Sequence, residues 1–430
     1  MSAEEQTGHI PVGGSPGPEQ PLRLSNRSLP QVLFGCVFSL IAIPAAAQKT
    51  TFNPAFNLDL FASNNVDYVG DSGRSDRGLH LGLSLPVERS LKRGSIAFNY
   101  NPAITLYGEF TELDNISHLV SLEASTQPSR NSSLSFRAGY SKTQEQGDPR
   151  SLDPADLFLD RRTDRERASV DLFYQAQPAE RWSWDFSLGA SGWLFQEIED
   201  FEEEQPGIPL EDRVEFRGTV GVARTLSPSD SIGLSYGFRF FDLDLSGEET
   251  SQSVSLVYQR DIEDRISLGL SLGAFYNTGD ATTGAPGSRG GEQSGVQGGL
   301  SLTRTFRQSS LSFVAGHAPS AGGARIGTSL NGYVGLSYVS ANTRYWNWGL
   351  LSRVARRDPS NPEQPTIDSF TASIQIGRNL GRQLGIRLGG DYVYQSSSAE
   401  VAADSSYLRG SLGLVWFPLG RSGVMGGGSN

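Results

Sequence analysis

The sequence predicts an all-β fold: a closed, antiparallel transmembrane β-barrel of about 18 strands, with short turns at one end and long loops at the other. Apolar and polar residues alternate strictly in many segments, and the connections between these segments are alternately short and long. After the N-terminal region, no stretch of about 18 apolar residues could form a membrane helix. A sheet with one apolar face closes on itself in lipid, because lipid cannot satisfy the hydrogen-bonding groups of an open edge.

The N-terminus has the order of a secretory signal peptide. Arg23 and Arg27 precede an apolar run over residues 29–43, and three alanines follow at 45–47. A charged, an apolar and a small-residue region in this order direct export and end at a cleavage site. We therefore expect three parts: an N-terminal extension plus signal that is removed (1–47), the barrel (48–420) and a flexible C-terminal tail (421–430).

The composition excludes several classes of protein. The formal net charge of −11 disfavours binding to nucleic acid, and 37 % hydrophobic residues are too few for a helical membrane protein. Cys36 is the only cysteine and lies within the expected signal, so the exported chain would have neither disulfides nor thiolate metal sites. The sequence suggests no cofactor.

Each predicted strand has one apolar face and one face of small polar residues. At 232–240 the even positions are Ile, Leu, Tyr, Phe and Phe, whereas the odd positions are Gly, Ser, Gly and Arg. The segments 182–190, 266–276 and 384–392 alternate in the same way. Soluble sheets usually bury their large residues on an inner face. Here the opposite face consists largely of small polar residues, which suggests that the large residues face lipid and the small polar ones face a lumen.

The connections set the strand count and the orientation. Eight short turns are expected near 90–94, 128–131, 178–181, 228–230, 261–264, 307–309, 340–342 and 381–383. Nine long loops are expected near 64–77, 107–116, 143–164, 197–212, 242–250, 278–293, 317–328, 357–367 and 396–405. These connections join 18 strands with both chain ends on the short-turn side, which is periplasmic in outer-membrane barrels. We therefore expect a bacterial outer-membrane location.

Aromatic residues are expected to form girdles at both membrane interfaces. Those assigned to the turn side are Trp182, Trp184, Trp416 and Phe417, and those assigned to the loop side are Tyr107, Tyr140, Trp193, Phe240, Tyr276, Trp346, Trp348 and Tyr394. Outer-membrane barrels commonly end on an aromatic residue that the barrel-insertion machinery reads. Here Trp416 and Phe417 would serve that purpose from an internal position.

Charged residues on the expected lumen face are the candidate pore lining. They are Arg137, Asp185, Arg217, Arg239, Arg304, Arg378, Arg387 and Asp391. Rings of charge set the selectivity of a pore, whereas charges of mixed sign also pair across neighbouring strands and stiffen the wall. Both interpretations stay open at this point.

An acidic loop is a weak candidate metal site. Its carboxylates are Glu197, Glu199, Asp200, Glu202, Glu203 and Glu204. Clustered carboxylates bind hard cations such as calcium, and they also attract cationic solutes or remain simply solvated. A protease-like segment at 70–73 and a calcium-loop-like segment at 242–247 have no companion motifs. We therefore expect no catalytic residues and no enzymatic activity.

The repeated unit of a polar turn followed by alternating Ser and apolar residues, as in 226–236 and 264–271, resembles the β-barrel porin families of Gram-negative bacteria. Some of these are uncharacterised barrels encoded near exopolysaccharide-export genes. The resemblance spans residues 50–418 and carries no diagnostic motif, so it implies location, architecture and transport only. We expect a passive porin-like channel for small solutes, with lipid and lipopolysaccharide around it. The alternatives are a polysaccharide-export barrel and a structural or adhesive barrel without an open pore.

Overall fold

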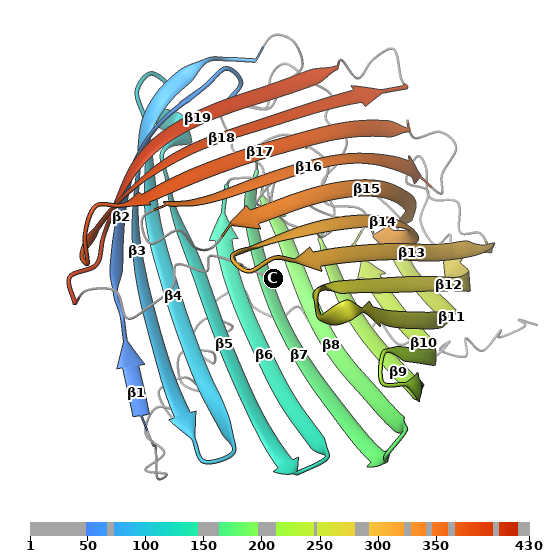
Figure 1. The fold of residues 1–430 in the computed structure, drawn as a ribbon. Coiled ribbons are helices and arrows are strands. Elements are labelled where there is room, and N and C mark those ends of the chain that lie inside the picture. Colours follow the sequence, from blue (N-terminus) through green and yellow to red (C-terminus); the bar gives the residue numbers. More distant parts are fainter. Residues whose placement is uncertain are drawn as a thin grey trace, which may run out of the picture. The chain divides into compact units, whose positions relative to one another are not determined.

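The computed structural model shows that the strands form one closed barrel (Figure 1). The structure describes residues 49–66, 73–144, 163–196, 212–244, 247–279, 292–321, 328–340, 346–359, 366–398 and 404–419. The described residues belong to one compact unit. The expected leader 1–47 and tail 421–430 lie outside the described residues, so these two boundaries stay predictions. In the described part of the chain, no helix is long and apolar enough to cross a membrane.

Within the described residues, nineteen strands and two 3-10 turns follow one another. The strands are β1 (Lys49–Phe52), β2 (Ala55–Ser63), β3 (Asp76–Leu91), β4 (Gly94–Tyr107), β5 (Asn115–Ser129), β6 (Ser132–Thr143), β7 (Asp164–Ala179), β8 (Trp182–Gln196), β9 (Arg213–Ser227), β10 (Asp230–Leu243), β11 (Gly247–Ile262), β12 (Ile266–Gly279), β13 (Gln293–Thr305), β14 (Ser309–Ala321), β15 (Thr328–Ser340), β16 (Trp346–Pro359), β17 (Ile367–Asn379), β18 (Leu384–Ser397) and β19 (Ser405–Trp416). The 3-10 turns are η1 (Thr111–Leu113) and η4 (Glu263–Arg265).

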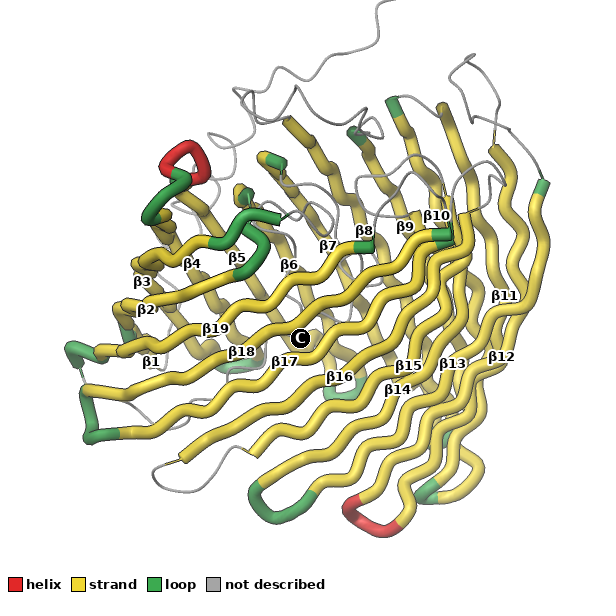
Figure 2. The backbone as a smooth tube through the Cα atoms, turned by 90° about the horizontal axis from the view of Figure 1, so that it is seen from above, coloured by secondary structure: helices red, strands yellow, loops and turns green. Residues whose placement is uncertain are grey.

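The barrel has 18 antiparallel strands, as the sequence predicts. Each strand from β2 to β19 pairs with the next along the chain, and β19 pairs with β2 to close the ring (Figure 2). The extra strand β1 precedes Pro54 and β2 in the chain, and it pairs with the turn end of β3, next to the stretch of β3 that pairs with β2. Proline has no N–H to donate, so an interruption at this position costs the sheet little. Because β19 pairs with β2, the backbone hydrogen-bonding groups of these two strands have partners within the wall.

The turns and loops lie where the sequence places them, with three differences. The loop expected at 242–250 is a tight hairpin, because β10 continues to Leu243 and β11 begins at Gly247. Strand β14 similarly continues to Ala321, into the loop expected at 317–328. Trp346 and Trp348 lie at the turn end of β16 rather than at its loop end, because Trp346 is the first residue of that strand.

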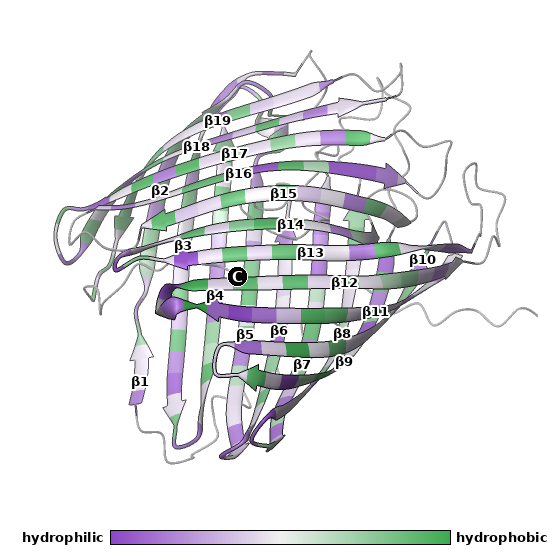
Figure 3. Cartoon of the chain, turned by 45° about the vertical axis from the view of Figure 1, so that its right-hand side comes forward, coloured by the Kyte–Doolittle hydropathy of each residue, from purple (hydrophilic) through white to green (hydrophobic). Residues whose placement is uncertain are grey.

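Hydrophobic and polar residues alternate along the strands of the wall (Figure 3). Large hydrophobic side chains that a soluble barrel would bury are exposed around the ring, including Leu234 at 52 %, Leu272 at 66 % and Val296 at 63 %. On β8, β10, β12, β18 and β19 these are the even-numbered residues, as predicted. An apolar band of this kind around a closed barrel requires hydrocarbon as its solvent.

Buried hydrophobic residues form small clusters rather than one core. Phe61, Tyr107 and Leu113 pack together where η1 folds over the loop ends of β2 and β4. The ring centroids of Phe61 and Tyr107 are 5.4 Å apart in an edge-on arrangement. The backbone N–H groups of Glu109 and Phe110 donate to the Asp76 carboxylate, at 3.1 and 3.0 Å. These contacts fix one extracellular loop against the inside of the wall, so Tyr107 does not belong to the outer girdle.

Candidate functional site

The strand register decides which charged residues face the lumen. In β9 and β10, Arg217 lies opposite Arg239, while the flanking pair Phe216 and Phe240 belongs to the apolar outer face. The same alternation places six of the eight candidate pore-lining residues on the inner face: Arg137, Asp185, Arg217, Arg239, Arg387 and Asp391.

Arg304 and Arg378 do not lie on the inner face, contrary to the sequence-based prediction. Arg304 lies opposite Ile266 and Leu311, and Arg378 lies opposite Trp346 and Ile386. Both arginines therefore share the apolar outer face, at the turn end of their strands. The reason is their parity, since Arg304 is two residues from Leu302, which is 40 % exposed on the outer surface.

Two ion pairs on the inner face join strands that are separated by one other strand. In each pair, the residue of that middle strand that lies between the two partners is a glycine. Asp171 on β7, Gly189 on β8 and Arg217 on β9 are directly in register. The Arg217 Nη2 to Asp171 Oδ1 distance is 2.5 Å. A Cβ atom on Gly189 would collide with the Asp171 carboxylate and with Arg217 Nε. Glycine therefore permits an ion pair between strands that are not neighbours, and the pair ties three strands together.

The second ion pair spans the seam that closes the barrel. Arg387 on β18, Gly413 on β19 and Asp59 on β2 are in register in the same way. Arg387 Nη2 lies 2.6 Å from Asp59 Oδ2, and a Cβ atom on Gly413 would overlap the Asp59 carboxylate. Asp59 is buried, with only 5 % of the residue exposed. The first strand of the barrel, β2, is thus linked to the penultimate strand, β18, by a charge-assisted bond that crosses the β19–β2 backbone ladder.

Other charges on the inner face remain open to the lumen. Arg239 and Asp185 are both exposed, and neither has an ion-pair partner in the described part of the chain. Asp391 accepts a 2.5 Å hydrogen bond from the Ser373 hydroxyl, and Arg137 lies 3.5 Å from Glu123. The inner wall thus combines charges neutralised by partners with a few that face water.

Trp193 lies on the other face of the wall from the one that the sequence predicts. Expected in the outer girdle, it instead faces inward between Arg167 on β7 and Arg213 on β9. Their guanidinium carbons lie 4.1 and 4.5 Å from its ring centroid, and its exposed fraction is 3 %. The signal was present in the sequence, because Trp193 has the odd parity of Asp185 rather than the even parity of Trp184.

The acidic-loop candidates for a metal site, Glu197, Glu199, Asp200, Glu202, Glu203 and Glu204, lie outside the described residues. Among the residues that the structure does describe, no group of three or more His, Cys, Asp or Glu side chains could hold a metal ion. Asp212, at the end of this loop, accepts a 2.7 Å hydrogen bond from the Phe195 N–H. Burial raises the pKa of its carboxyl, the Phe195 hydrogen bond opposes that rise, and the nearby Asp244 adds to it.

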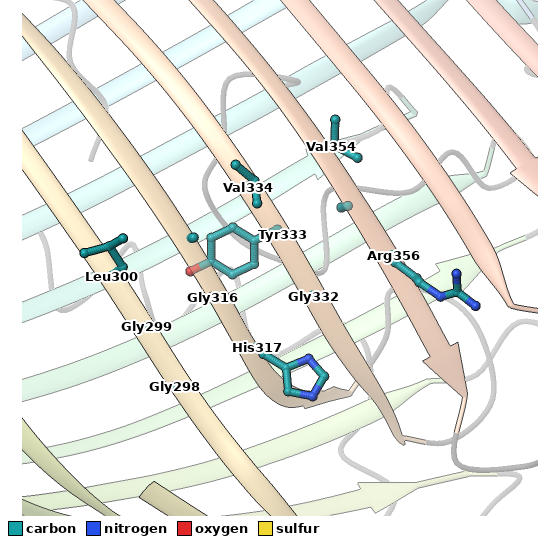
Figure 4. A pocket seen from close by; sticks show the side chains of 12 residues that line it. Gly298, Gly299, Leu300, Gly316, His317, Gly332, Tyr333, Val334, Val354 and Arg356 are labelled. Atoms are coloured by element: carbon teal, nitrogen blue, oxygen red, sulfur yellow. The ribbon is translucent and has the colours of Figure 1, made fainter. Parts of the chain in front are cut away.

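A depression of about 540 Å³ lies on strands β13 to β16 (Figure 4). Gly298, His317, Gly332 and Arg356 form one row across these strands in register. Val334 is two residues from Gly332 and therefore belongs to the next row on the same face. Because Val334 is 49 % exposed on the outer surface, the depression faces lipid and not the lumen. The depression forms where glycines in the apolar band provide no side chain, and it does not belong to the pore wall.

A closed antiparallel barrel with an exposed apolar band, short turns on one side and a polar inner face is a transmembrane β-barrel of the bacterial outer-membrane type. The sequence matches no family model and no curated protein. Among solved structures, the chain is similar to Pseudomonas aeruginosa OccK2 (OpdF), with a TM-score of 0.46, 10 % identity, and 86 % of this chain and 98 % of that chain covered. It is also similar to a BenF-like porin from Pseudomonas fluorescens Pf-5, with a TM-score of 0.45, 8 % identity, and coverage of 86 % and 99 %.

Replacing Gly189 with leucine is expected to separate Asp171 from Arg217 and to destabilise the barrel by about 1–3 kcal/mol, as overpacking does. The temperature at which the barrel loses its compact electrophoretic mobility would measure the change. Gly192→Leu is the matched control, because a Cβ atom at Gly192 on the same strand meets nothing within 4 Å. Equal stability of the two variants would show that the glycine is not needed for the ion pair.

Proposed function

We propose that this protein is a passive, porin-like channel for small solutes in the bacterial outer membrane. The observation that carries the proposal is the inner wall of the barrel. Serine, glycine and charges of both signs line the inside of a closed ring of 18 strands. Barrels of 16 to 18 strands are wide enough to enclose an aqueous channel. Lipid, lipopolysaccharide and the barrel-insertion machinery are its proposed partners, and no chemical step is part of its role.

The charges on the wall favour weak rather than strong ion selectivity. Arg217 and Arg387 are neutralised by Asp171 and Asp59, so they contribute little net field to the lumen. Arg239 and Asp185 carry opposite signs and face water. The proposed selectivity therefore depends on a small number of charges without partners.

Single-channel recording from the refolded exported chain in planar bilayers tests the proposal. We expect stable conductance steps and a reversal potential close to zero in a salt gradient. Arg239→Gln should shift the reversal potential toward cations, and Asp185→Asn should shift it toward anions, because each change removes one wall charge of known sign. Trp184→Ala, on the outer face, should leave both conductance and selectivity unchanged.

Absence of conductance from a correctly folded, heat-modifiable barrel would overturn the channel proposal. Conductance that does not respond to either charge change would instead place the solute path away from β8 and β10.

A further inference from the structure

A three-residue pattern recurs immediately before five of the periplasmic turns. An arginine is followed, two residues later, by leucine, isoleucine or phenylalanine. The five copies are Arg89-Ser90-Leu91, Arg224-Thr225-Leu226, Arg260-Asp261-Ile262, Arg304-Thr305-Phe306 and Arg378-Asn379-Leu380. Because residues two apart share a face of a strand, each arginine and its apolar partner point the same way.

Three of these arginines occupy equivalent places in the barrel. Each lies opposite the third residue of the following strand, which is Ile232 for Arg224, Leu311 for Arg304 and Ile386 for Arg378. On the other side, each lies opposite the first residue of a neighbouring strand: Trp182, Ile266 or Trp346. All three are therefore at one depth, on the outer face, at the periplasmic end.

Each of the three guanidinium groups lies against an aromatic ring. The guanidinium carbons of Arg224, Arg304 and Arg378 are 5.6, 5.0 and 5.0 Å from the ring centroids of Trp182, Phe306 and Trp346, respectively. The three arginines are exposed, and no carboxylate in the described part of the chain pairs with them. Arg260 differs, because Asp230 lies opposite it and 3.6 Å away.

Apolar side chains lie above and below each of these cations on the same face. Arg304, for example, lies between Leu302 and Phe306, which are 40 % and 38 % exposed. Leu226 and Leu380, each 51 % exposed, lie beyond Arg224 and Arg378 on the periplasmic side. A guanidinium held at the edge of a hydrocarbon band is costly unless it reaches an anion, and an arginine side chain is long enough to reach the headgroup layer.

We propose that Arg224, Arg304 and Arg378 form three equivalent binding sites for the phosphate of anionic phospholipids in the periplasmic leaflet. In each site the guanidinium would donate to the phosphate oxygens, which arginine binds with matched geometry. The neighbouring ring would lie at the level of the glycerol, as girdle aromatics do. The sites require membrane insertion but not an open lumen, so they are independent of conduction.

Tryptophan quenching by brominated lipids tests this proposal with the full exported chain. Five of the six tryptophans, namely Trp182, Trp184, Trp346, Trp348 and Trp416, lie at the periplasmic end of the outer face, so their fluorescence reports the lipid at this rim. Vesicles would contain brominated phosphatidylglycerol mixed with unbrominated phosphatidylcholine, and then the reverse. We expect the unmodified chain to prefer phosphatidylglycerol. In the triple variant R224Q/R304Q/R378Q, the binding constant of phosphatidylglycerol relative to phosphatidylcholine should fall about fivefold, because each site loses one interfacial basic residue.

Arg356→Gln is the control, because Arg356 is an outward arginine at the opposite rim that pairs with Asp358 at 3.1 Å. Its lipid preference should equal that of the unmodified chain. If the triple variant does not fold, the single variants Arg224→Gln and Arg378→Gln remain informative beside Trp182 and Trp346. A preference for phosphatidylglycerol that survives in the variants would overturn the proposal. A preference that inorganic phosphate in the buffer abolishes would also overturn it, because free phosphate would then be the ligand.

Discussion

Replacing Trp193 with alanine is expected to lower the free energy of unfolding by about 3–5 kcal/mol, the usual cost of truncating a buried tryptophan. The ring is 3 % exposed and separates Arg167 from Arg213, so its loss leaves a cavity between two cations. The attraction of both guanidinium groups to the ring is lost as well. Chemical denaturation in detergent micelles, followed by circular dichroism, would measure the change.

Trp184→Ala is the matched control for this prediction. Trp184 is on the same strand, but it faces outward and is 60 % exposed. Its loss removes contact with lipid and leaves no cavity within the wall, so the effect on unfolding should be much smaller. An equal loss of stability in both variants would contradict the inward placement of Trp193.

Arg387→Met is expected to destabilise the closing seam of the barrel by about 1–3 kcal/mol, because it leaves the buried Asp59 carboxylate without its cation. A fully buried pair would cost more to break, but the Arg387 side chain is 34 % exposed and lumen water partly replaces it. Asp59→Asn should cost less, since it removes the buried charge itself. In the double variant most of the loss from Arg387→Met should be recovered.

The double-mutant cycle isolates the coupling between the two residues, with heat-modifiable mobility as the readout of an intact barrel. Arg356→Met is the control, since Arg356 forms an exposed pair with Asp358 on the outer face and should have little effect. Additive losses from Arg387→Met and Asp59→Asn would show that this pair does not stabilise the seam.

Much of the fold follows from the sequence, because alternation with a period of two is a property of consecutive residues. It gave 18 strands, the outward set that includes Leu234 and Leu272, and the side on which the turns lie. The same rule would have placed Arg304, Arg378 and Trp193 correctly. The errors arose where residue type was weighed above parity: arginine was expected in a lumen and tryptophan in a girdle.

The contacts between strands could not be read from the sequence. Asp59 and Arg387 are 328 positions apart, and they meet only because β19 pairs with β2 in a register that places Gly413 between them. That register depends on the lengths of all the turns and on closure of the ring, and a slip of one residue would move every side chain to the other face. The sequence by itself therefore determined which face each residue prefers, whereas tertiary closure decided which charges became partners.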